Sequence, residues 1–483
     1  MIETLKLVWP HVTAALSILV AVAASAHAII HKRDSRSSVG WVALIWLVPF
    51  VGSVLYLTLG INRIHRKAMS LRGQKRLSNA PEGAPAMQPG NLENSWAPEH
   101  RYFIPLSRLC GRVTGRELLS GNNITPLCNG DEAYPRMLDA IDMAQRSIGI
   151  TTYIFDCDKA GHLFMEALSR AVKRGVEVRV LIDAVGARYS FPSAVHMLRR
   201  SGIRTALFMP TYLPWSTPYV NLRSHRKIMT IDGNTAFTGG MNIREGNLLA
   251  ENPRHPVQDI HALITGPVVR ELQEVFTDDW HFATGEKLAG EPWYPPLLQT
   301  GDMIARAVSD GPDHDYDKMR FVMIGALSIA RHSVRIATPY FIPDLSLISA
   351  LNTAAMRGVA VDILLPEKNN LRMVQWACMA QLWQVLEWGC RVWFTPPPFD
   401  HSKIFVVDEA WSLAGSANWD ARSLRLNFEI GIEAYDTVLA AQMVKIFEQK
   451  KNNSTPLTFE KARSRPLPLQ LRDGIARLFA PYL

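Results

Sequence analysis

The sequence predicts an α/β protein with two similar lobes in one chain, preceded by a two-helix transmembrane hairpin. Three observations carry this prediction. The 483 residues are enough for roughly three structural units of about 150 residues each. Residues 1–62 contain two long uncharged apolar runs, and the rest of the chain repeats one pattern of strands and helices. The composition, 48% hydrophobic and 20% charged, excludes a disordered chain.

The hairpin is predicted from two apolar runs. Residues 12–30 and 39–61 contain no Asp, Glu, Lys or Arg, and each is long enough to cross a bilayer as a helix. Residues 24–26 have the small side chains of a signal-peptidase site. However, Glu3 and Lys6 stand where a signal peptide has a basic cluster, and a second apolar run follows. We therefore expect two spans that are retained in the mature protein.

The basic residues predict the topology of the hairpin. Residues 63–76 contain six basic residues and no acidic one, whereas the loop between the apolar runs has three, Lys32, Arg33 and Arg36, with Asp34. By the positive-inside rule both ends of the hairpin lie in the cytoplasm. The five cysteines are odd in number and have no close pairs, which favours a reducing compartment. We expect a multi-pass protein of the cell inner membrane with a cytoplasmic catalytic body.

The positive charge is concentrated in two segments. The net charge of the chain is +8. The combined net positive charge of residues 63–76 and of the tail 461–483 is larger than this, so the remainder of the chain is slightly acidic. This argues against a nucleic-acid partner, which requires a broad cationic surface. The tail is also amphipathic, with Leu469, Ile475 and Phe479. Attraction to anionic membrane lipid is one interpretation and a solvated tail is the other.

The body of the chain is duplicated. Residues 147–153 and 333–340 are both typical of strands, and residues 174–182 and 357–365 both place a helix-ending glycine before a buried apolar strand. Each copy alternates strands with helices, as an α/β lobe does. The predicted domains are the hairpin (1–62), a basic juxtamembrane segment and linker (63–120), the first lobe (121–300), the second lobe (301–460) and the basic amphipathic tail (461–483).

Both lobes carry the same polar residues at the same spacing. A histidine is followed by a lysine two residues later, an aspartate five residues after that, and an asparagine ten residues further on, just after a glycine-containing turn. A single copy of such a pattern is weak, but two copies at matched repeat positions indicate a shared site. The two sets are His225, Lys227, Asp232 and Asn242 in the first lobe, and His401, Lys403, Asp408 and Asn418 in the second.

This set suits chemistry at a phosphodiester. One imidazole can attack phosphorus while a second, protonated imidazole gives its proton to the departing alkoxide. Two lysines and two asparagines can hold the non-bridging oxygens, which is electrostatic work that metal ions often perform. We therefore expect neither a metal nor another cofactor.

The doubled motif resembles the signature of the phospholipase D superfamily, and the chain is similar to the bacterial cardiolipin synthases within it. This resemblance implies two phospholipase D-type lobes. It rests on the doubled motif together with shorter runs that occur in order around it. These runs are Pro49–Gly52, Asp278–Trp280 with Thr284 and Gly285, Asn418-x-Asp420-x-Arg422-Ser423, and Asn427-x-Glu429.

The resemblance implies a reaction. His225 takes the phosphatidyl group from one phosphatidylglycerol, and a second phosphatidylglycerol then accepts it, which forms cardiolipin and releases glycerol. His401 acts as the acid and then the base, while the lysines and asparagines hold the phosphate. Acidic residues that orient the histidines match Asp259 and Glu429, although which carboxylate serves which histidine stays open. Asp232 and Asp408 are expected to be structural members of the motif, because a carboxylate beside the phosphate would repel it.

Other functions remain as alternatives. The same histidines serve a membrane-bound phospholipase D or phosphodiesterase, with water as the acceptor, and phosphatidylethanolamine could replace one phosphatidylglycerol. A metal-dependent phosphatidyltransferase would need more acidic residues than Asp473–Arg477 provides. A lipid-binding scaffold without activity is disfavoured by intact motifs in both lobes. The sequence does not indicate the oligomeric state.

Overall fold

The computed structural model describes residues 2–32, 35–60, 96–210 and 222–480. The chain forms two units, residues 1–70 and residues 71–483. The predicted basic segment 63–76 lies outside the described residues.

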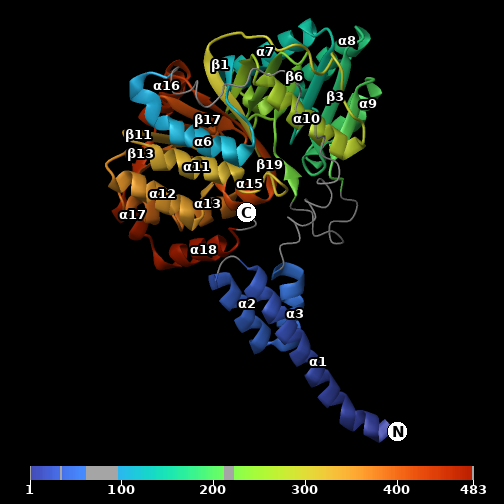
Figure 1. Ribbon diagram of the computed structural model, residues 1–483, viewed down its shortest axis with the longest axis vertical. Helices are drawn as coiled ribbons and strands as arrows, with labels where there is room; N and C mark the ends of the chain where they lie inside the picture. The colour runs from blue at the N-terminus through green and yellow to red at the C-terminus, as the bar shows by residue number, and fades with distance from the viewer. Residues whose placement is uncertain (1, 33–34, 61–95, 211–221, 481–483) are drawn as a thin grey trace. The chain divides into compact units, whose positions relative to one another are not determined.

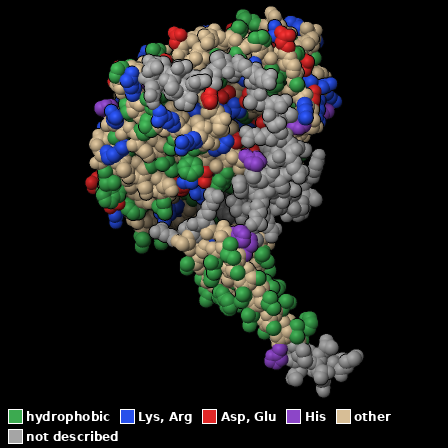
Figure 2. All heavy atoms as spheres, in the orientation of Figure 1, with side chains coloured by type: hydrophobic (Ala, Val, Ile, Leu, Met, Phe, Trp, Pro, Cys, Tyr) green, Lys and Arg blue, Asp and Glu red, His purple; other side chains and the backbone are tan. Residues whose placement is uncertain are grey.

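The first unit is a small helical bundle. It contains α1 (Ile2–His31), α2 (Ser35–Leu47), α3 (Pro49–Leu55) and a π-helical turn, η1 (Tyr56–Gly60). Within the described residues, the one helical stretch long and apolar enough to cross a membrane is His11–His31 in α1. Apolar side chains cover the outside of these helices (Figure 2), a surface that suits hydrocarbon rather than water.

The predicted hairpin is confirmed in part. Its second arm is not one helix, because the backbone of Val48 leaves the helical conformation and Pro49 begins a new helix. A proline disrupts the helix that precedes it and is favoured at a helix start. Gly52 allows the two short helices to meet, since a Cβ at this position would collide with the carbonyl oxygen of Leu44.

The second unit contains the two predicted lobes, and the α/β fold class is confirmed. In each lobe three parallel strands continue into an antiparallel set, with helices packed on both faces of the sheet (Figure 1). The first lobe consists of β1 (Leu119–Cys128), α7 (Asn129–Met143), β2 (Ser147–Thr152), α8 (Lys159–Lys173), β3 (Glu177–Asp183), α9 (Ala194–Arg200), β4 (Arg204–Phe208), β5 (Arg223–Ser224), β6 (Ile228–Ile231), β7 (Thr235–Gly239), β8 (Val257–Gln258), β9 (Ile260–Thr265) and α10 (Val269–Thr284).

The second lobe follows the same order of main elements, with additional short strands and helices between them. It consists of β10 (Met303–Asp310), α11 (Lys318–Ile329), β11 (Ser333–Ala337), β12 (Phe341–Ile342), α12 (Leu345–Met356), β13 (Ala360–Pro366), α13 (Arg372–Met379), α14 (Trp383–Leu386), β14 (Arg391–Thr395), β15 (Phe399–Asp400), β16 (Ile404–Val407), β17 (Trp411–Gly415), β18 (Trp419–Asp420), α15 (Ala421–Arg425), β19 (Asn427–Tyr435) and α16 (Thr437–Asn452). The elements β20 (Thr455–Leu457), α17 (Phe459–Arg463) and α18 (Leu467–Leu478) follow. The helix α6 (Ile104–Thr114) precedes the first lobe in sequence but packs on α11, with Leu106 and Cys110 in the core of the second lobe.

The two lobes are joined by strand pairing. β1 pairs with β10, so the sheets of the two lobes are continuous. Two very short strands add reciprocal links, because β5 of the first lobe pairs with β19 of the second, and β15 of the second pairs with β8 of the first. Each of these short strands immediately precedes a motif histidine. The histidine segments are therefore held by the opposite lobe.

Candidate active site

A cavity of about 880 Å³ lies where the two lobes meet. His225, Asn242 and Asp259 from the first lobe line it together with His401 and Asn418 from the second. The structure thus brings the two motif histidines to one cavity. Their charges are close enough that His225 lowers the pKa of His401.

The backbone places each histidine. His225 follows β5, and its N–H donates to the carbonyl oxygen of Phe428 at 2.9 Å. His401 follows β15, and its N–H donates to the carbonyl oxygen of Gln258 at 2.7 Å. Phe428 and Gln258 each lie one residue before a buried carboxylate, Glu429 or Asp259. The strand pairing therefore brings each histidine beside a carboxylate of the other lobe.

The histidine and carboxylate pairs are crossed between the lobes. Nδ1 of His225 lies 3.1 Å from Glu429, and Nδ1 of His401 lies 2.7 Å from Asp259. A carboxylate on Nδ1 fixes the ring orientation and leaves Nε2 to act on a ligand. The sequence left this pairing open, and the structure assigns each histidine the carboxylate of the opposite lobe.

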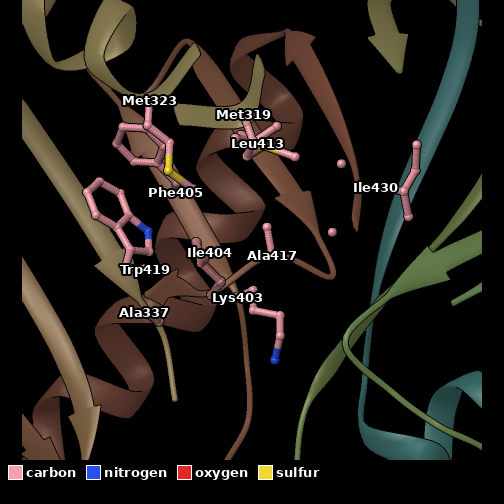
Figure 3. A pocket seen from close by; sticks show the side chains of 12 residues that line it. Met319, Met323, Ala337, Lys403, Ile404, Phe405, Leu413, Ala417, Trp419 and Ile430 are labelled. Atoms are coloured by element: carbon pink, nitrogen blue, oxygen red, sulfur yellow. The ribbon is translucent and has the colours of Figure 1, made fainter. Parts of the chain in front are cut away.

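The motif lysines lie against the backbone of their own histidines. Lys227 Nζ donates to the carbonyl oxygen of His225 at 2.7 Å, and Lys403 Nζ donates to that of His401 at 2.6 Å. Lys403 Nζ is also 3.1 and 3.2 Å from the two ring nitrogens of His401. Figure 3 shows the Lys403 ammonium pointing away from the apolar side chains of Phe405 and Trp419. The apolar surroundings thus direct this charge toward the histidine.

The motif asparagines line the cavity and also brace its walls. Asn242 Oδ1 accepts the N–H of Ile154 at 3.1 Å, and Asn418 Nδ2 donates to Ser423 Oγ at 3.1 Å. The motif aspartates bind backbone instead. Asp232 accepts three consecutive N–H groups, residues 145–147, at 2.7 to 2.9 Å. Asp408 does the same with residues 331–333 at 2.7 to 2.8 Å. These carboxylates hold the starts of β2 and β11.

Burial sets the protonation of the site. It lowers the pKa of His225, although Glu429 opposes this shift. It lowers the pKa of His401 further, with help from the charges of Lys403 and Lys227. Both imidazoles are therefore neutral at pH 7 in the free protein. Burial also lowers the pKa of Lys227 to about 7 and that of Lys403 to about 8.

The pKa values of the two carboxylates, Asp259 and Glu429, are shifted in opposite directions. Burial raises the pKa of Asp259 to about 6. Burial also opposes ionisation of Glu429, yet the charges of His225 and Lys227 and a hydrogen bond from Ser416 bring its pKa below the ordinary value. Glu429 is therefore fully ionised at neutral pH.

Two aromatic residues at the site were not among the site residues predicted from the sequence. The ring of Tyr153 lies 5.5 Å from that of His225, and the ring of Tyr340 lies 6.2 Å from that of His401, centroid to centroid. Both tyrosines line the cavity. They occupy matching places after β2 and β11, so their recurrence in the repeat was the available signal. In the part of the chain that the structure describes, no group of three His, Cys, Asp or Glu side chains has the arrangement of a metal site.

Comparison with known proteins gives the family. The model described as cardiolipin synthase, PLD-like domain matches residues 137–280 and 323–451, and a phospholipase D-nuclease N-terminal model matches residues 19–60. A cardiolipin synthase of Geobacillus thermodenitrificans is 30% identical over 456 residues, which cover 94% of this chain and 90% of that protein. The major cardiolipin synthase of Bacillus subtilis is 30% identical over 461 residues, covering 94% of this chain and 95% of that protein.

A solved structure supports the same architecture. The crystal structure of phosphatidylserine synthase from Haemophilus influenzae aligns with a TM-score of 0.60 and 16% identity, covering 78% of this chain and 100% of that one. At this identity the likeness concerns the fold alone. Together with the twofold match of the family model, it confirms the duplicated body.

Proposed function

Because this chain belongs to the cardiolipin synthases, phosphatidyltransferases of the phospholipase D superfamily, we propose that it joins two phosphatidylglycerols through a phosphohistidine at His225. The observation that carries this mechanism is the crossed pair of histidines at one cavity. Two imidazoles oriented by separate carboxylates can hold opposite protonation states on either side of one phosphorus.

In the first step Nε2 of His225 attacks the phosphorus of the donor lipid. The bond between phosphorus and the glycerol oxygen breaks, and His401 in its protonated form gives its proton to that oxygen. The His225 ring then carries positive charge with its Nδ1–H directed at Glu429. The low pKa of Glu429 supports this role, because an ionised carboxylate stabilises the charged ring.

In the second step the neutral His401 removes the proton from the hydroxyl of the acceptor lipid. The resulting oxygen attacks phosphorus, the bond from phosphorus to Nε2 breaks, and His225 returns to its neutral form. The lowered pKa of His401 supports its role as the base in this step, since the neutral ring is the form that accepts a proton. The protonated form that the first step needs is favoured by the anionic phosphodiester bound between the two histidines, because a nearby negative charge stabilises the imidazolium. Lys227, Lys403, Asn242 and Asn418 hold the non-bridging oxygens in both steps.

The membrane setting is part of the proposal. The hairpin unit anchors the chain in the cell inner membrane in multi-pass form, with the body in the cytoplasm. The tail binds anionic lipid through α18, whose outer side exposes Leu467, Leu471, Ile475 and Leu478. These positions follow a helical period and form one apolar stripe.

The experiment uses purified full-length protein in vesicles of phosphatidylglycerol and phosphatidylcholine, with label in the phosphatidylglycerol and a chelator present. We expect cardiolipin and glycerol in equal amounts. Phosphatidic acid without cardiolipin would instead show that water is the acceptor. Vesicles with added phosphatidylethanolamine test the remaining alternative, because ethanolamine release would identify that lipid as a donor.

A further inference from the structure

The residue between the motif histidine and the motif lysine differs between the two lobes. It is Arg226 in the first lobe and Ser402 in the second. His225 lines the cavity, whereas the Arg226 side chain extends into the protein interior and is 1% exposed. A guanidinium group buried to this extent requires an anionic partner and hydrogen-bond acceptors. Its partners therefore show which parts of the molecule it holds together.

The anionic partner of Arg226 is Asp279, in α10. Nη1 of Arg226 donates to both carboxylate oxygens of Asp279, at 2.8 and 2.9 Å, and Asp279 is fully buried. Asp279 belongs to the run of residues 278–280, which has no part in the reaction steps above. This ion pair anchors the guanidinium group of Arg226 to a helix of the first lobe.

The other donors of Arg226 bind the second lobe. Nε donates to the backbone carbonyl oxygen of Glu429 at 3.0 Å, and Nη2 donates to that of Asp310 at 3.2 Å. Asp310 and Glu429 are paired residues of the neighbouring strands β10 and β19. The guanidinium carbon also lies 5.4 Å from the centre of the Phe428 ring. One side chain of the first lobe therefore contacts both residues of β19 that hold His225.

These contacts surround the pair formed by His225 and Glu429. The N–H of His225 donates to the carbonyl oxygen of Phe428 at 2.9 Å, and Nδ1 of His225 lies 3.1 Å from the carboxylate of Glu429. Arg226 is the next residue in the chain and binds the same two residues of β19 from the interior. The main chain of Glu429 is therefore fixed relative to that of His225. This matters because a carboxylate that orients a catalytic group works only within a narrow range of geometry.

The pair formed by His401 and Asp259 is held by different contacts. Asn129 Oδ1 accepts the N–H of Asp259 at 3.0 Å, and the N–H of Asn129 donates to the carbonyl oxygen of Asp259 at 2.9 Å. Ser402, at the position of Arg226, donates its backbone N–H to Asp400 Oδ1 at 3.0 Å. A neutral asparagine thus holds the main chain of Asp259, whereas a guanidinium group in a buried ion pair holds that of Glu429. The charged anchor belongs to the half of the site to which the covalent step is assigned.

We propose that Arg226, anchored by Asp279, is a positioning residue that holds Glu429 against His225 during the covalent step. This inference rests on the proposed function, since it requires a phosphohistidine at His225. Formation of the adduct places positive charge on the His225 ring, and breakdown of the adduct removes that charge. A displaced Glu429 therefore slows formation of the adduct without slowing its breakdown.

The test is Arg226→Lys in the full-length protein, with labelled phosphatidylglycerol in phosphatidylcholine vesicles and rapid quench. Lysine keeps a positive charge beside Asp279 but lacks the planar fork that also reaches Glu429. We expect the rate constant of adduct formation to fall by about tenfold or more, because small displacements of a catalytic group are costly. The rate constant of adduct breakdown should stay within about twofold of wild type or increase.

The pH profile of adduct formation gives a second readout. Burial, Lys227 and Lys403 lower the pKa of His225, whereas Glu429 raises it. Only the neutral ring attacks phosphorus, so the acidic limb of the profile reports this pKa. The limb should move to lower pH in Arg226→Lys, because a displaced Glu429 raises the pKa of His225 less.

The matched control is Arg306→Lys. Arg306 is also 1% exposed and donates to the carboxylate of Glu433, a buried residue of the same strand β19. It donates further to the backbone carbonyl oxygens of Ser107 at 3.0 Å and Arg116 at 2.8 Å. These four residues lie outside the cavity lining. The control variant should lower the Tm of the detergent-solubilised chain, yet leave adduct formation per folded molecule within about twofold of wild type.

A second variant, Asp279→Asn, decides the test if Arg226→Lys does not fold. Asparagine keeps the shape of Asp279 and one acceptor oxygen, so adduct formation should slow by about threefold or more while breakdown is unchanged. The positioning role is overturned by unchanged adduct formation, by equal slowing of both steps with an unshifted acidic limb, or by an equal loss in Arg306→Lys. If the wild-type protein forms no adduct, the proposed function itself fails, which is a distinguishable result.

Discussion

The two halves of the active site share one layout but hold their carboxylates differently. Glu429 receives a hydrogen bond from Ser416 Oγ and another from Asn427 Nδ2 at 3.2 Å, in addition to His225. Asp259 receives the N–H of Ile260 at 2.8 Å and faces Gly240, the residue at the repeat position of Ser416. A Cβ at position 240 would collide with the Asp259 carboxylate. The glycine of one motif thus makes room for a carboxylate, whereas the serine of the other motif donates to one.

The motif lysines of the two halves also have different neighbours. Lys403 lies against both ring nitrogens of His401, whereas Lys227 lies 5.8 Å from the centre of the Tyr153 ring. Positive charge near His401 disfavours its protonated form, and negative charge near His225 favours a charged ring. These differences favour a charged ring at His225 over one at His401, which supports the proposed covalent role of His225.

The largest loss of activity is expected when either motif histidine is replaced. His225→Ala and His401→Ala should each reduce turnover by at least about 10³-fold, because nucleophile and acid are both required. An acid-labile phosphatidyl adduct should form in His401→Ala protein and be absent in His225→Ala protein. Mass spectrometry of the acid-sensitive peptide checks this. An adduct on His401 in the His225→Ala protein would reverse the two roles.

The next largest loss of activity is expected at the two carboxylates that pair with the histidines, and it should differ between them. Glu429→Gln should reduce kcat by about 10²-fold or more, since the amide cannot balance a charged His225 ring. Asp259→Asn should reduce kcat less, because Asp259 is easier to protonate. The rates of adduct formation and adduct breakdown, measured by rapid quench, show which step each variant slows. A larger loss for Asp259→Asn would contradict the assignment of the covalent step to His225.

The lysines predict a pH effect that also differs between the halves. Lys227 loses its charge as the pH rises through about 7, and Lys403 does so through about 8. Arginine stays charged over this range. The ratio of kcat/KM for Lys227→Arg to that for wild type should therefore increase from about pH 6 to about pH 9. For Lys403→Arg the increase should begin at higher pH. Parallel profiles for wild type and both variants would show that the lysine charge does not limit the reaction.

The smallest effect on catalysis is expected at the turn aspartates. Asp232→Asn removes one of two oxygens that accept three backbone N–H groups, which should cost about 1–3 kcal/mol of unfolding free energy. Asp408→Asn should cost more, since Asp408 also accepts the hydroxyl of Tyr102 at 2.8 Å. Denaturant unfolding of the detergent-solubilised chain measures both. A kcat per folded molecule that falls by more than about tenfold would give these residues a direct role in the chemistry.

Much of the site could be predicted because the chain is a repeat. The spacing from His225 to Asn242 equals that from His401 to Asn418, and such agreement between distant segments requires no knowledge of the fold. The tyrosines beside the histidines belong to the same repeat, but tyrosine at the end of a strand is too common to stand out without its neighbours in space. The break of the second apolar run at Pro49 was less visible, since hydrophobicity alone does not distinguish one long helix from two short ones.

The sequence by itself determined the duplicated α/β architecture, the apolar amino-terminal segment and the motif residues of the candidate site, because strand periodicity, hydrophobicity and motif spacing are local properties of a chain. Only the tertiary structure decided which carboxylate serves which histidine. These contacts depend on the pairing of β5 with β19 and of β15 with β8. Such pairings join segments that are far apart in the chain, and their register follows from the packing of the whole body.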